Sequence, residues 1–140
     1  MARNAAKNII KRMIQNEIDV SKSTIAIFGV TFKDNCPDIR NSKVFDLVEE
    51  FESWGINVKL IDPWADKVQV KNEFGYSLVP YSSSLEVDSV VVAVGHQEFK
   101  DIDVKSFKII CKNERPVFGD LKSIFSKEEL ESAGFSVIRL

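Results

Sequence analysis

Continuous apolar runs alternate with amphipathic stretches along the chain, and this alternation predicts an α/β fold. The runs 24–30 (TIAIFGV) and 89–94 (SVVVAV) are apolar and rich in β-branched residues, whereas 57–61 (NVKLI) alternates polar and apolar positions. Continuous apolar runs are typical of strands buried on both faces of a parallel sheet, and alternation is also typical of a strand. We therefore expect three strands, with the run 89–94 at the centre of the sheet.

A helix is expected between the strands at 24–30 and 57–61. Val44, Leu47, Val48 and Phe51 recur at helical spacing, and Gly55 follows where a left-handed C-terminal cap is favoured. Together with the strands on either side, this helix completes a β-α-β unit within about 38 residues, the size of a right-handed crossover.

Apolar positions also recur at helical spacing before the first strand, which predicts an amphipathic helix over 3–18. Such a helix needs a surface to pack on. It either covers the sheet of this domain or is the end of a longer helix that arrives from another domain. The second alternative would make this chain a fragment of a longer protein.

The remaining expected elements are shorter. A capping box at 126–129 (SKEE) predicts a helix that ends at Gly134. We also expect short helices within 65–75 and 82–87, and short strands at 76–79, 108–111, 116–118 and 135–140. No repeat or linker interrupts the pattern, so we expect one doubly wound α/β domain, with helices on both faces of a mainly parallel sheet.

Composition and charge narrow the possible functions. With 140 residues, 44% apolar and 29% charged, the chain has the size and composition of a single globular domain. Its net charge of −2 argues against bulk electrostatic binding of nucleic acid or of an anionic membrane. No apolar run reaches the roughly 18–20 residues needed to cross a bilayer, and the N-terminal segment lacks the apolar core of a signal peptide. Cys36 and Cys111 suggest neither a disulfide framework nor a metal site, so we expect two free thiols in the cytoplasm.

A long loop follows the first strand. Twelve residues, 31–42, separate this strand from the next helix, whereas such loops normally need about 2–6 residues. Ligands of open α/β sheets bind at the carboxyl ends of the strands, where this loop lies. Gly29 stands alone where a dinucleotide fingerprint needs three glycines, and no P-loop motif occurs. Lys33, just past the strand end, is the candidate for contacting a phosphate or a sugar hydroxyl.

A purely structural interpretation of the same loop is also open. Asp38 and Arg40 would then pair with each other, and Asn41 or Ser42 would cap the next helix. Cys36 could be a nucleophile activated by the cations of this loop, or it could be a partly buried free thiol, which we favour.

Polar residues follow three further strand ends. Asp62 could bond a ribose, but without the glycine fingerprint we favour a turn from which Trp64 packs on the domain or against a neighbour. His96 is the single histidine, and we expect a structural or solvent-facing role for it rather than a catalytic one. Lys122 could converge with Lys33 on one anion.

Five motifs occur in order along nearly the whole chain: GVTFK (29–33), CPDIRNS (36–42), DPW (62–64), AVGHQEF (93–99) and DLK (120–122). With them the chain resembles the C-terminal, UDP-binding domain of the UDP-glucose/GDP-mannose dehydrogenase family, whose members are NAD-dependent nucleotide-sugar 6-dehydrogenases. It is most similar to the subgroup that oxidises UDP-N-acetylhexosamines. Gly95 stands where many members carry alanine.

The resemblance implies a Rossmann-like UDP-sugar-binding domain over 21–140, preceded at 1–20 by the end of a central interdomain helix. The N-terminal domain, with its NAD-binding loop and its catalytic cysteine, would be absent from this chain. NAD would then bind mainly elsewhere, no catalytic residue is expected here, and the fragment alone is expected to be inactive. In the family reaction the C6 alcohol of the sugar is oxidised twice, through a thioester on that cysteine, to a uronic acid.

The resemblance also assigns substrate-binding residues. Thr31, Phe32 and Lys33 should line the cleft, with Lys33 contacting the UDP-sugar. Lys122 matches a position where relatives carry a cation near the nucleotide sugar.

Asp38 and Arg40 match the family motif and should order the loop or form a subunit interface. The implied partners are a UDP-sugar, the N-terminal domain and further copies of the enzyme in a homo-oligomer, and the implied pathway is polysaccharide biosynthesis. No nucleic acid, membrane or metal is expected.

Two functions outside catalysis compete with this one. The domain could be a non-catalytic nucleotide-binding or assembly module that pairs with other subunits through the helix 3–18 and Trp64. A flavodoxin-like receiver would need an acidic cluster at the strand ends, which Asp34, Asp38 and Asp62 do not convincingly form.

Overall fold

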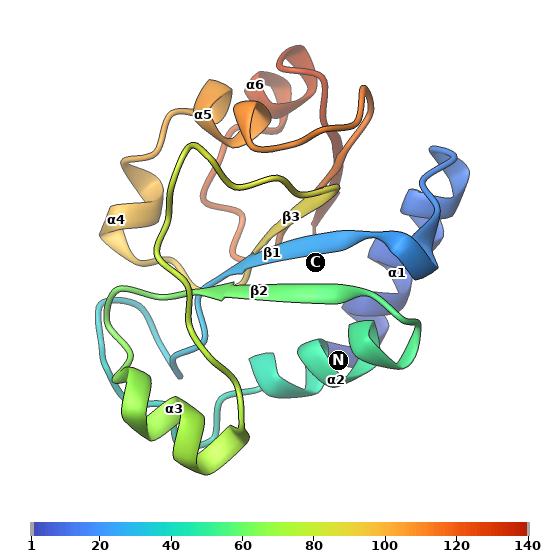
Figure 1. Ribbon diagram of the computed structural model, residues 1–140. Helices are drawn as coiled ribbons and strands as arrows, with labels where there is room; N and C mark the ends of the chain where they lie inside the picture. The colour runs from blue at the N-terminus through green and yellow to red at the C-terminus, as the bar shows by residue number, and fades with distance from the viewer. Residues whose placement is uncertain (1, 140) are drawn as a thin grey trace.

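A computed structural model describes residues 2–139 and shows a five-stranded parallel sheet between two layers of helices (Figure 1). The strand order is β2-β1-β3-β4-β5. The strands are β1 (Thr24–Phe28), β2 (Asn57–Ile61), β3 (Ser89–Val92), β4 (Val117–Asp120) and β5 (Ser136–Arg139). The helices are α1 (Ala2–Gln15), α2 (Val44–Ser53), α3 (Lys67–Phe74), α4 (Gln97–Lys100), α5 (Val104–Ile109) and α6 (Lys127–Ser132), with a 3-10 turn at Val20–Lys22. The doubly wound α/β fold is confirmed, and every strand pair is parallel.

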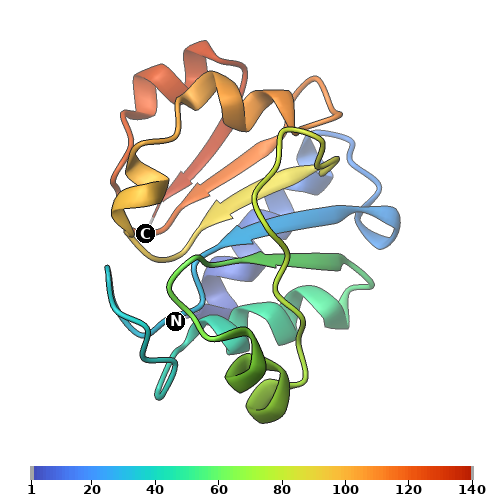
Figure 2. The same ribbon diagram turned by 60° about the vertical axis from the view of Figure 1, so that its left-hand side comes forward.

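Both faces of the sheet are buried, which explains the continuous apolar runs. In β1, Ile25 and Ile27 belong to one core, and Ala26 and Phe28 belong to the other. Helices α1 and α2 cover the first face, while α4, α5 and α6 cover the second (Figures 1 and 2). Strand β3 lies at the centre of the sheet, as expected, and all of its residues are buried.

Helix α1 packs on the sheet, which was one of the two alternatives for the N-terminal helix. Its buried stripe consists of Ala5, Ala6, Ile9, Ile10 and Met13. These residues share a core with α2 and the sheet. The helix ends at Gln15 rather than at residue 18, and Glu17 turns the chain with a left-handed φ of +62°.

Phenylalanine rings fill the second core. Phe28, Phe99, Phe107, Phe118, Phe125 and Phe135 form edge-to-face pairs with ring centroids 5.1 to 5.5 Å apart. Edge-to-face geometry is favourable because the positive edge of one ring meets the negative face of the next. The short helices α4, α5 and α6 are thus anchored to the sheet by side chains rather than by their own length.

The predicted strand at 108–111 is wrong, because α5 extends through this segment to Ile109. Its two adjacent isoleucines look like a strand, but Phe107 and Ile110 are buried at helical spacing. Helix α4, which follows β3, was not predicted at all.

The predicted helix at 82–87 is also wrong. The segment is extended around a turn at 83–84, and its last residue, Val87, forms an isolated parallel bridge with Cys111. The expected strand at 76–79 is reduced to one parallel bridge between Leu78 and Leu60.

Candidate functional site

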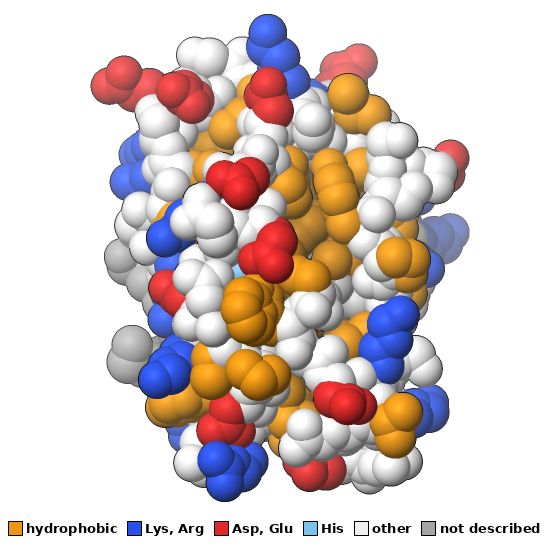
Figure 3. Space-filling view, turned by 90° about the vertical axis from the view of Figure 1, so that its left-hand side faces the viewer, with side chains coloured by type: hydrophobic (Ala, Val, Ile, Leu, Met, Phe, Trp, Pro, Cys, Tyr) orange, Lys and Arg blue, Asp and Glu red, His pale blue; other side chains and the backbone are white. Residues whose placement is uncertain are grey.

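The strand order places a switch point between β1 and β3, because the chain leaves β1 toward one side of the sheet and β3 lies on the other. Ligands of doubly wound sheets bind at such a point, beyond the carboxyl ends of the strands. Here the loop 31–42 follows β1, and the segment 93–97 follows β3. The arrows of β1 and β2 in Figure 1 point to this edge, and Figure 3 views the molecule from that side.

Asp62, which directly follows β2, accepts hydrogen bonds from the backbone of two segments at this edge. Its Oδ2 accepts hydrogen bonds from the backbone N–H of Val30 (2.8 Å) and Thr31 (3.2 Å). Its Oδ1 accepts from the backbone N–H of Trp64 (2.7 Å) and Ala65 (3.1 Å), which forms the expected turn. The carboxylate is buried, so it cannot bond a ribose and instead ties the end of β2 to the loop after β1.

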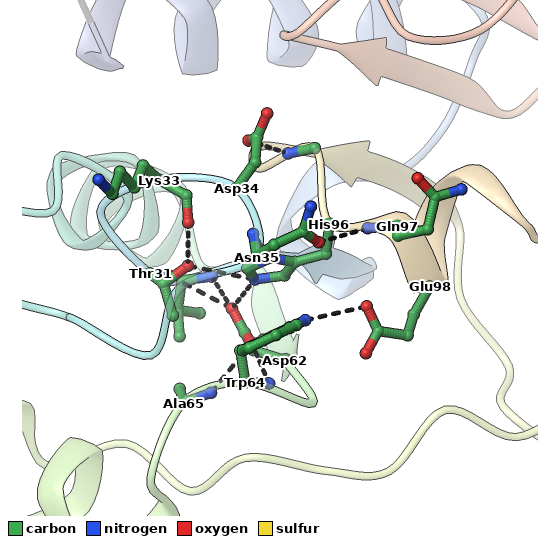
Figure 4. A network of polar contacts seen from close by, with 12 residues as sticks. Thr31, Lys33, Asp34, Asn35, Asp62, Trp64, Ala65, His96, Gln97 and Glu98 are labelled. Atoms are coloured by element: carbon green, nitrogen blue, oxygen red, sulfur yellow. Dashed lines mark hydrogen bonds and ion pairs between the residues drawn. The ribbon is translucent and has the colours of Figure 1, made fainter.

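His96 is completely buried and joins the same network (Figure 4). Its Nδ1 accepts a hydrogen bond from the backbone N–H of Asn35 at 2.8 Å, so the ring proton must lie on Nε2. Nε2 lies 3.0 Å from Asp62 Oδ2 and 3.1 Å from Thr31 Oγ1, and its N–H donates to both oxygens. The ring is therefore a structural element with both nitrogens engaged, one of the two roles expected for it.

The hydrogen bonds also determine the ionisation of Asp62. Burial by itself raises the pKa of this carboxyl, but the hydrogen bonds from His96 and from the backbone of Val30 and Trp64 outweigh it. The net pKa of Asp62 lies below its ordinary value, and the group is a carboxylate near neutral pH.

Two exposed side chains clasp the loop after β1 to the segment after β3. Asp34 Oδ1 accepts from the backbone N–H of Gly95 at 2.7 Å, and Asn35 Oδ1 accepts from that of Gln97 at 2.8 Å. Asn35 has a φ of +53°, a left-handed conformation that asparagine tolerates better than most residues. A Cβ on Gly95 would lie 2.9 Å from Asp34 Oδ2, so the glycine leaves room for this carboxylate.

The three neighbouring residues of the predicted cleft differ in their environments. Thr31 is only 1% exposed, and its hydroxyl donates to the carbonyl oxygen of Lys33 at 3.1 Å. The Thr31 side chain therefore supports the loop, and its role in lining the cleft stays a prediction. Phe32 is 54% exposed, and the side chain of Lys33 extends away from the network (Figure 4).

Asp38 and Arg40 form the ion pair that the structural interpretation of the loop predicted. Arg40 Nε and Nη2 each lie 3.0 Å from a different carboxylate oxygen of Asp38. This pairing lowers the pKa of Asp38. The Asp38 carbonyl accepts from the backbone N–H of Phe32 at 2.7 Å, which closes the loop. At the start of α2, Ser42 Oγ accepts from the Val44 N–H at 3.3 Å.

Lys122 lies on a different part of the edge. A cavity of about 510 Å³ opens there, and Lys122, Leu121, Ala93 and Lys43 are among its lining residues. Lys33 is not among them, so the cation that shares a cavity with Lys122 is Lys43, which the sequence did not single out. A lysine directly before a helix carries no pattern that would have drawn attention to it.

A second hollow, of about 330 Å³, opens near the Trp64 turn and is visible as an apolar depression in Figure 3. Pro63, Tyr81 and Phe99 contribute to its walls. The Trp64 indole lies beside it, 6.0 Å from the His96 ring, and donates to Glu98 Oε1 at 2.9 Å. The indole thus packs on its own domain.

The cysteines show no sign of a nucleophilic site. Cys36 and Cys111 are both free thiols, as expected. His96 has no nitrogen left to activate Cys36, and burial raises the pKa of Cys111 to about 12. Within residues 2–139, no group of three or more His, Cys, Asp or Glu side chains is placed to hold a metal ion, and no helix is long and apolar enough to cross a membrane.

The fold and this edge together define a class: a doubly wound, Rossmann-like α/β domain that displays lysines at its switch point but lacks the glycine-rich dinucleotide loop. The model of the UDP-glucose/GDP-mannose dehydrogenase family, UDP binding domain, matches residues 26–127, and the chain belongs to this family.

Similar proteins cover the chain almost completely. The UDP-N-acetyl-D-glucosamine 6-dehydrogenase of Salmonella typhi is 36% identical over 129 residues, which are 92% of this chain and 30% of that protein. The UDP-N-acetyl-D-mannosamine dehydrogenase of Methanocaldococcus jannaschii is 32% identical over 91% of this chain and 28% of its own length. The chain thus spans about 30% of the length of the curated relatives it matches.

A solved structure agrees in fold. The crystal structure of NDP-N-acetyl-D-galactosaminuronic acid dehydrogenase from Methanosarcina mazei Go1 matches with a TM-score of 0.85 and 18% identity. The match covers 98% of this chain and 28% of that one. At this identity the likeness shows the fold alone.

Proposed function

We propose that this domain provides the UDP-sugar site of an NAD-dependent nucleotide-sugar 6-dehydrogenase. The enzyme would oxidise the C6 alcohol of a UDP-hexose or UDP-N-acetylhexosamine to the uronic acid. The observation that carries the proposal is the loop 31–42, whose backbone is held at the switch point while Lys33 is exposed. The names of the Salmonella and Methanocaldococcus relatives favour an N-acetylhexosamine as the sugar.

The residues of the edge have separate roles in this proposal. Lys33 contacts the diphosphate or the sugar as a mobile point charge, with Phe32 beside it in the cleft. Lys122 and Lys43 supply positive charge at the neighbouring cavity. Asp38 and Arg40 order the loop through their ion pair.

The residues present do not fit NAD. Gly29 is the single glycine of the turn after β1, and a Cβ there would lie 2.5 Å from the Cβ of Val94. This glycine lets the ends of β1 and β3 approach each other, and the turn lacks the further glycines through which a dinucleotide loop approaches a pyrophosphate. We therefore assign no step of hydride transfer to this chain and place NAD mainly on an N-terminal domain.

The resemblance to the dehydrogenase family further predicts a homo-oligomer in the cytoplasm that acts in polysaccharide biosynthesis. It also predicts that the fragment alone is inactive. A pure assembly module is less favoured, because the apolar stripe of α1 is already buried and the Trp64 N–H is already bonded to Glu98.

The test is an amide NMR titration of the chain with UDP, UDP-N-acetylglucosamine and NAD in turn. We expect shifts in residues 31–42 and 119–122 with both UDP ligands and little response to NAD. Lys33→Ala should weaken UDP binding about tenfold or more, because a charge-assisted hydrogen bond contributes about 1.5–3 kcal/mol.

Lys22→Ala is the matched control, since Lys22 precedes β1 at the opposite edge of the sheet. It should leave UDP binding unchanged. Equal effects of the two lysine variants, or a response to NAD as strong as that to UDP, would overturn the proposal.

A further inference from the structure

The segment 31–35 has no regular secondary structure, yet its backbone is held from two sides. On its buried side, His96 accepts a hydrogen bond from the backbone N–H of Asn35, and Asp62 accepts one from that of Thr31. From the side, the Asp34 and Asn35 side chains bind backbone N–H groups of the segment after β3. The bonds come from the ends of three adjacent strands, β2, β1 and β3.

A short chain of hydrogen bonds leads from the buried carboxylate to the exposed lysine. Asp62 accepts from His96, His96 donates also to Thr31, and the Thr31 hydroxyl donates to the carbonyl oxygen of Lys33. No buried side-chain nitrogen or oxygen among the described residues lacks a partner, so this network is complete. A fully satisfied buried network rigidifies its members, because displacing one of them leaves a polar group unpaired.

We infer that His96 is a positioning residue: with Asp62 and the Asp34–Asn35 clasp, it fixes the backbone at Lys33 and so orders the cation before the nucleotide sugar arrives. This inference rests on the proposed function, in which Lys33 meets the ligand. A loop that is already ordered does not lose its conformational freedom again when the ligand binds. The network therefore contributes to affinity without touching the ligand.

The fold-sparing test is Asn35→Gly. Glycine accepts the left-handed φ of +53°, and the backbone N–H that bonds His96 remains, but the side chain that holds Gln97 is lost. We expect unchanged thermal unfolding, faster hydrogen exchange of the amides 32–35, and a UDP dissociation constant raised roughly two- to tenfold.

His96 is tested by a pair of variants. His96→Phe removes both nitrogens, whereas the amide nitrogen of His96→Gln can replace Nε2 as the donor to Asp62. The glutamine variant should recover part of the affinity and of the exchange protection that the phenylalanine variant loses. Equal affinity for UDP in wild type and His96→Phe, with both proteins folded, would refute the positioning role.

A double-mutant cycle between Asn35→Gly and Lys33→Ala separates positioning from general stability. If the clasp acts through Lys33, Asn35→Gly should have little effect on UDP affinity once Lys33→Ala is present. Additive effects would overturn the inference while leaving the proposed function intact. If Lys33→Ala alone leaves UDP binding unchanged, the proposed function fails instead.

Discussion

The contact between Gly29 and Val94 allows a sharp prediction, because it brings together the ends of β1 and β3 directly beneath the candidate site. In Gly29→Ala, the added Cβ would lie 2.5 Å from Val94 Cβ, 2.7 Å from its Cγ2 and 2.9 Å from its backbone nitrogen. A backbone atom cannot rotate away as the end of a flexible side chain can. The two strand ends would therefore have to separate.

The expected cost has two parts. The φ of Gly29 is +104°, and a left-handed conformation costs an L-residue about 1–2 kcal/mol. Overpacking a close contact costs about 1–3 kcal/mol more. We therefore expect Gly29→Ala to lower the free energy of unfolding by about 2–5 kcal/mol.

Gly75→Ala is the matched control. Gly75 has a φ of +81° at the end of α3, and no heavy atom lies within 4 Å of the position of an added Cβ. Its substitution should cost only the conformational part, about 1–2 kcal/mol. Effects of glycine on the unfolded chain are common to both variants and cancel in the comparison.

The assay is urea unfolding monitored by circular dichroism, and the wild type and both variants are fitted with one common m-value. Gly29→Ala should lower the free energy of unfolding by about 1–3 kcal/mol more than Gly75→Ala does. If the variants lose the same stability to within about 0.5 kcal/mol, the close approach at Gly29 is not what the structure indicates.

Three other perturbations test the buried groups. Because the pKa of Asp62 is lowered on folding, its stabilising effect is present above the ordinary aspartate pKa of about 3.9 and is lost as the pH falls below it. The difference in unfolding free energy between wild type and Asp62→Asn should shrink accordingly in urea titrations from about pH 6 to pH 3, and a constant difference would contradict this reasoning. Burial raises the pKa of Cys111 to about 12, so iodoacetamide should label Cys36 well before Cys111 in the native protein. Mass spectrometry would follow the labelling, and equal rates for the two thiols would contradict the burial of Cys111. Phe107 is fully buried among other aromatic rings, so Phe107→Ala should cost about 3–5 kcal/mol in urea unfolding, and a loss below about 1 kcal/mol would show that the cluster is not tightly packed.

Much of the fold could be predicted from apolar patterning, and the errors have a common cause. The strands 24–28 and 89–92 lie within continuous apolar runs rich in β-branched residues, a pattern that indicates buried strands rather than amphipathic helices. Short runs are ambiguous: the isoleucines of 108–111 belong to a helix end, and the apolar positions of 82–87 to an extended segment. Their conformations depend on which surface they cover.

The candidate site was only partly predictable for a similar reason. The length of the loop 31–42 and its lysine pointed to the carboxyl ends of the strands, and the loop does follow the end of β1. Nothing in the sequence connected His96 with Asp62, which lie 34 positions apart and meet because β1 lies between β2 and β3. The same separation hid the shared cavity of Lys43 and Lys122.

The sequence by itself determined the class of fold, the order of its main elements and the family, because apolar periodicity and long motifs are local properties of the chain. Only the tertiary structure decided which polar groups are bonded within the loop and which remain exposed. Thr31 and Lys33 are two positions apart in one motif, yet the Thr31 side chain is buried and hydrogen-bonded while Lys33 is exposed. The physical reason is that a buried polar group must find its hydrogen-bond partners among whatever strand ends become its neighbours, and those neighbours exist only in the assembled sheet.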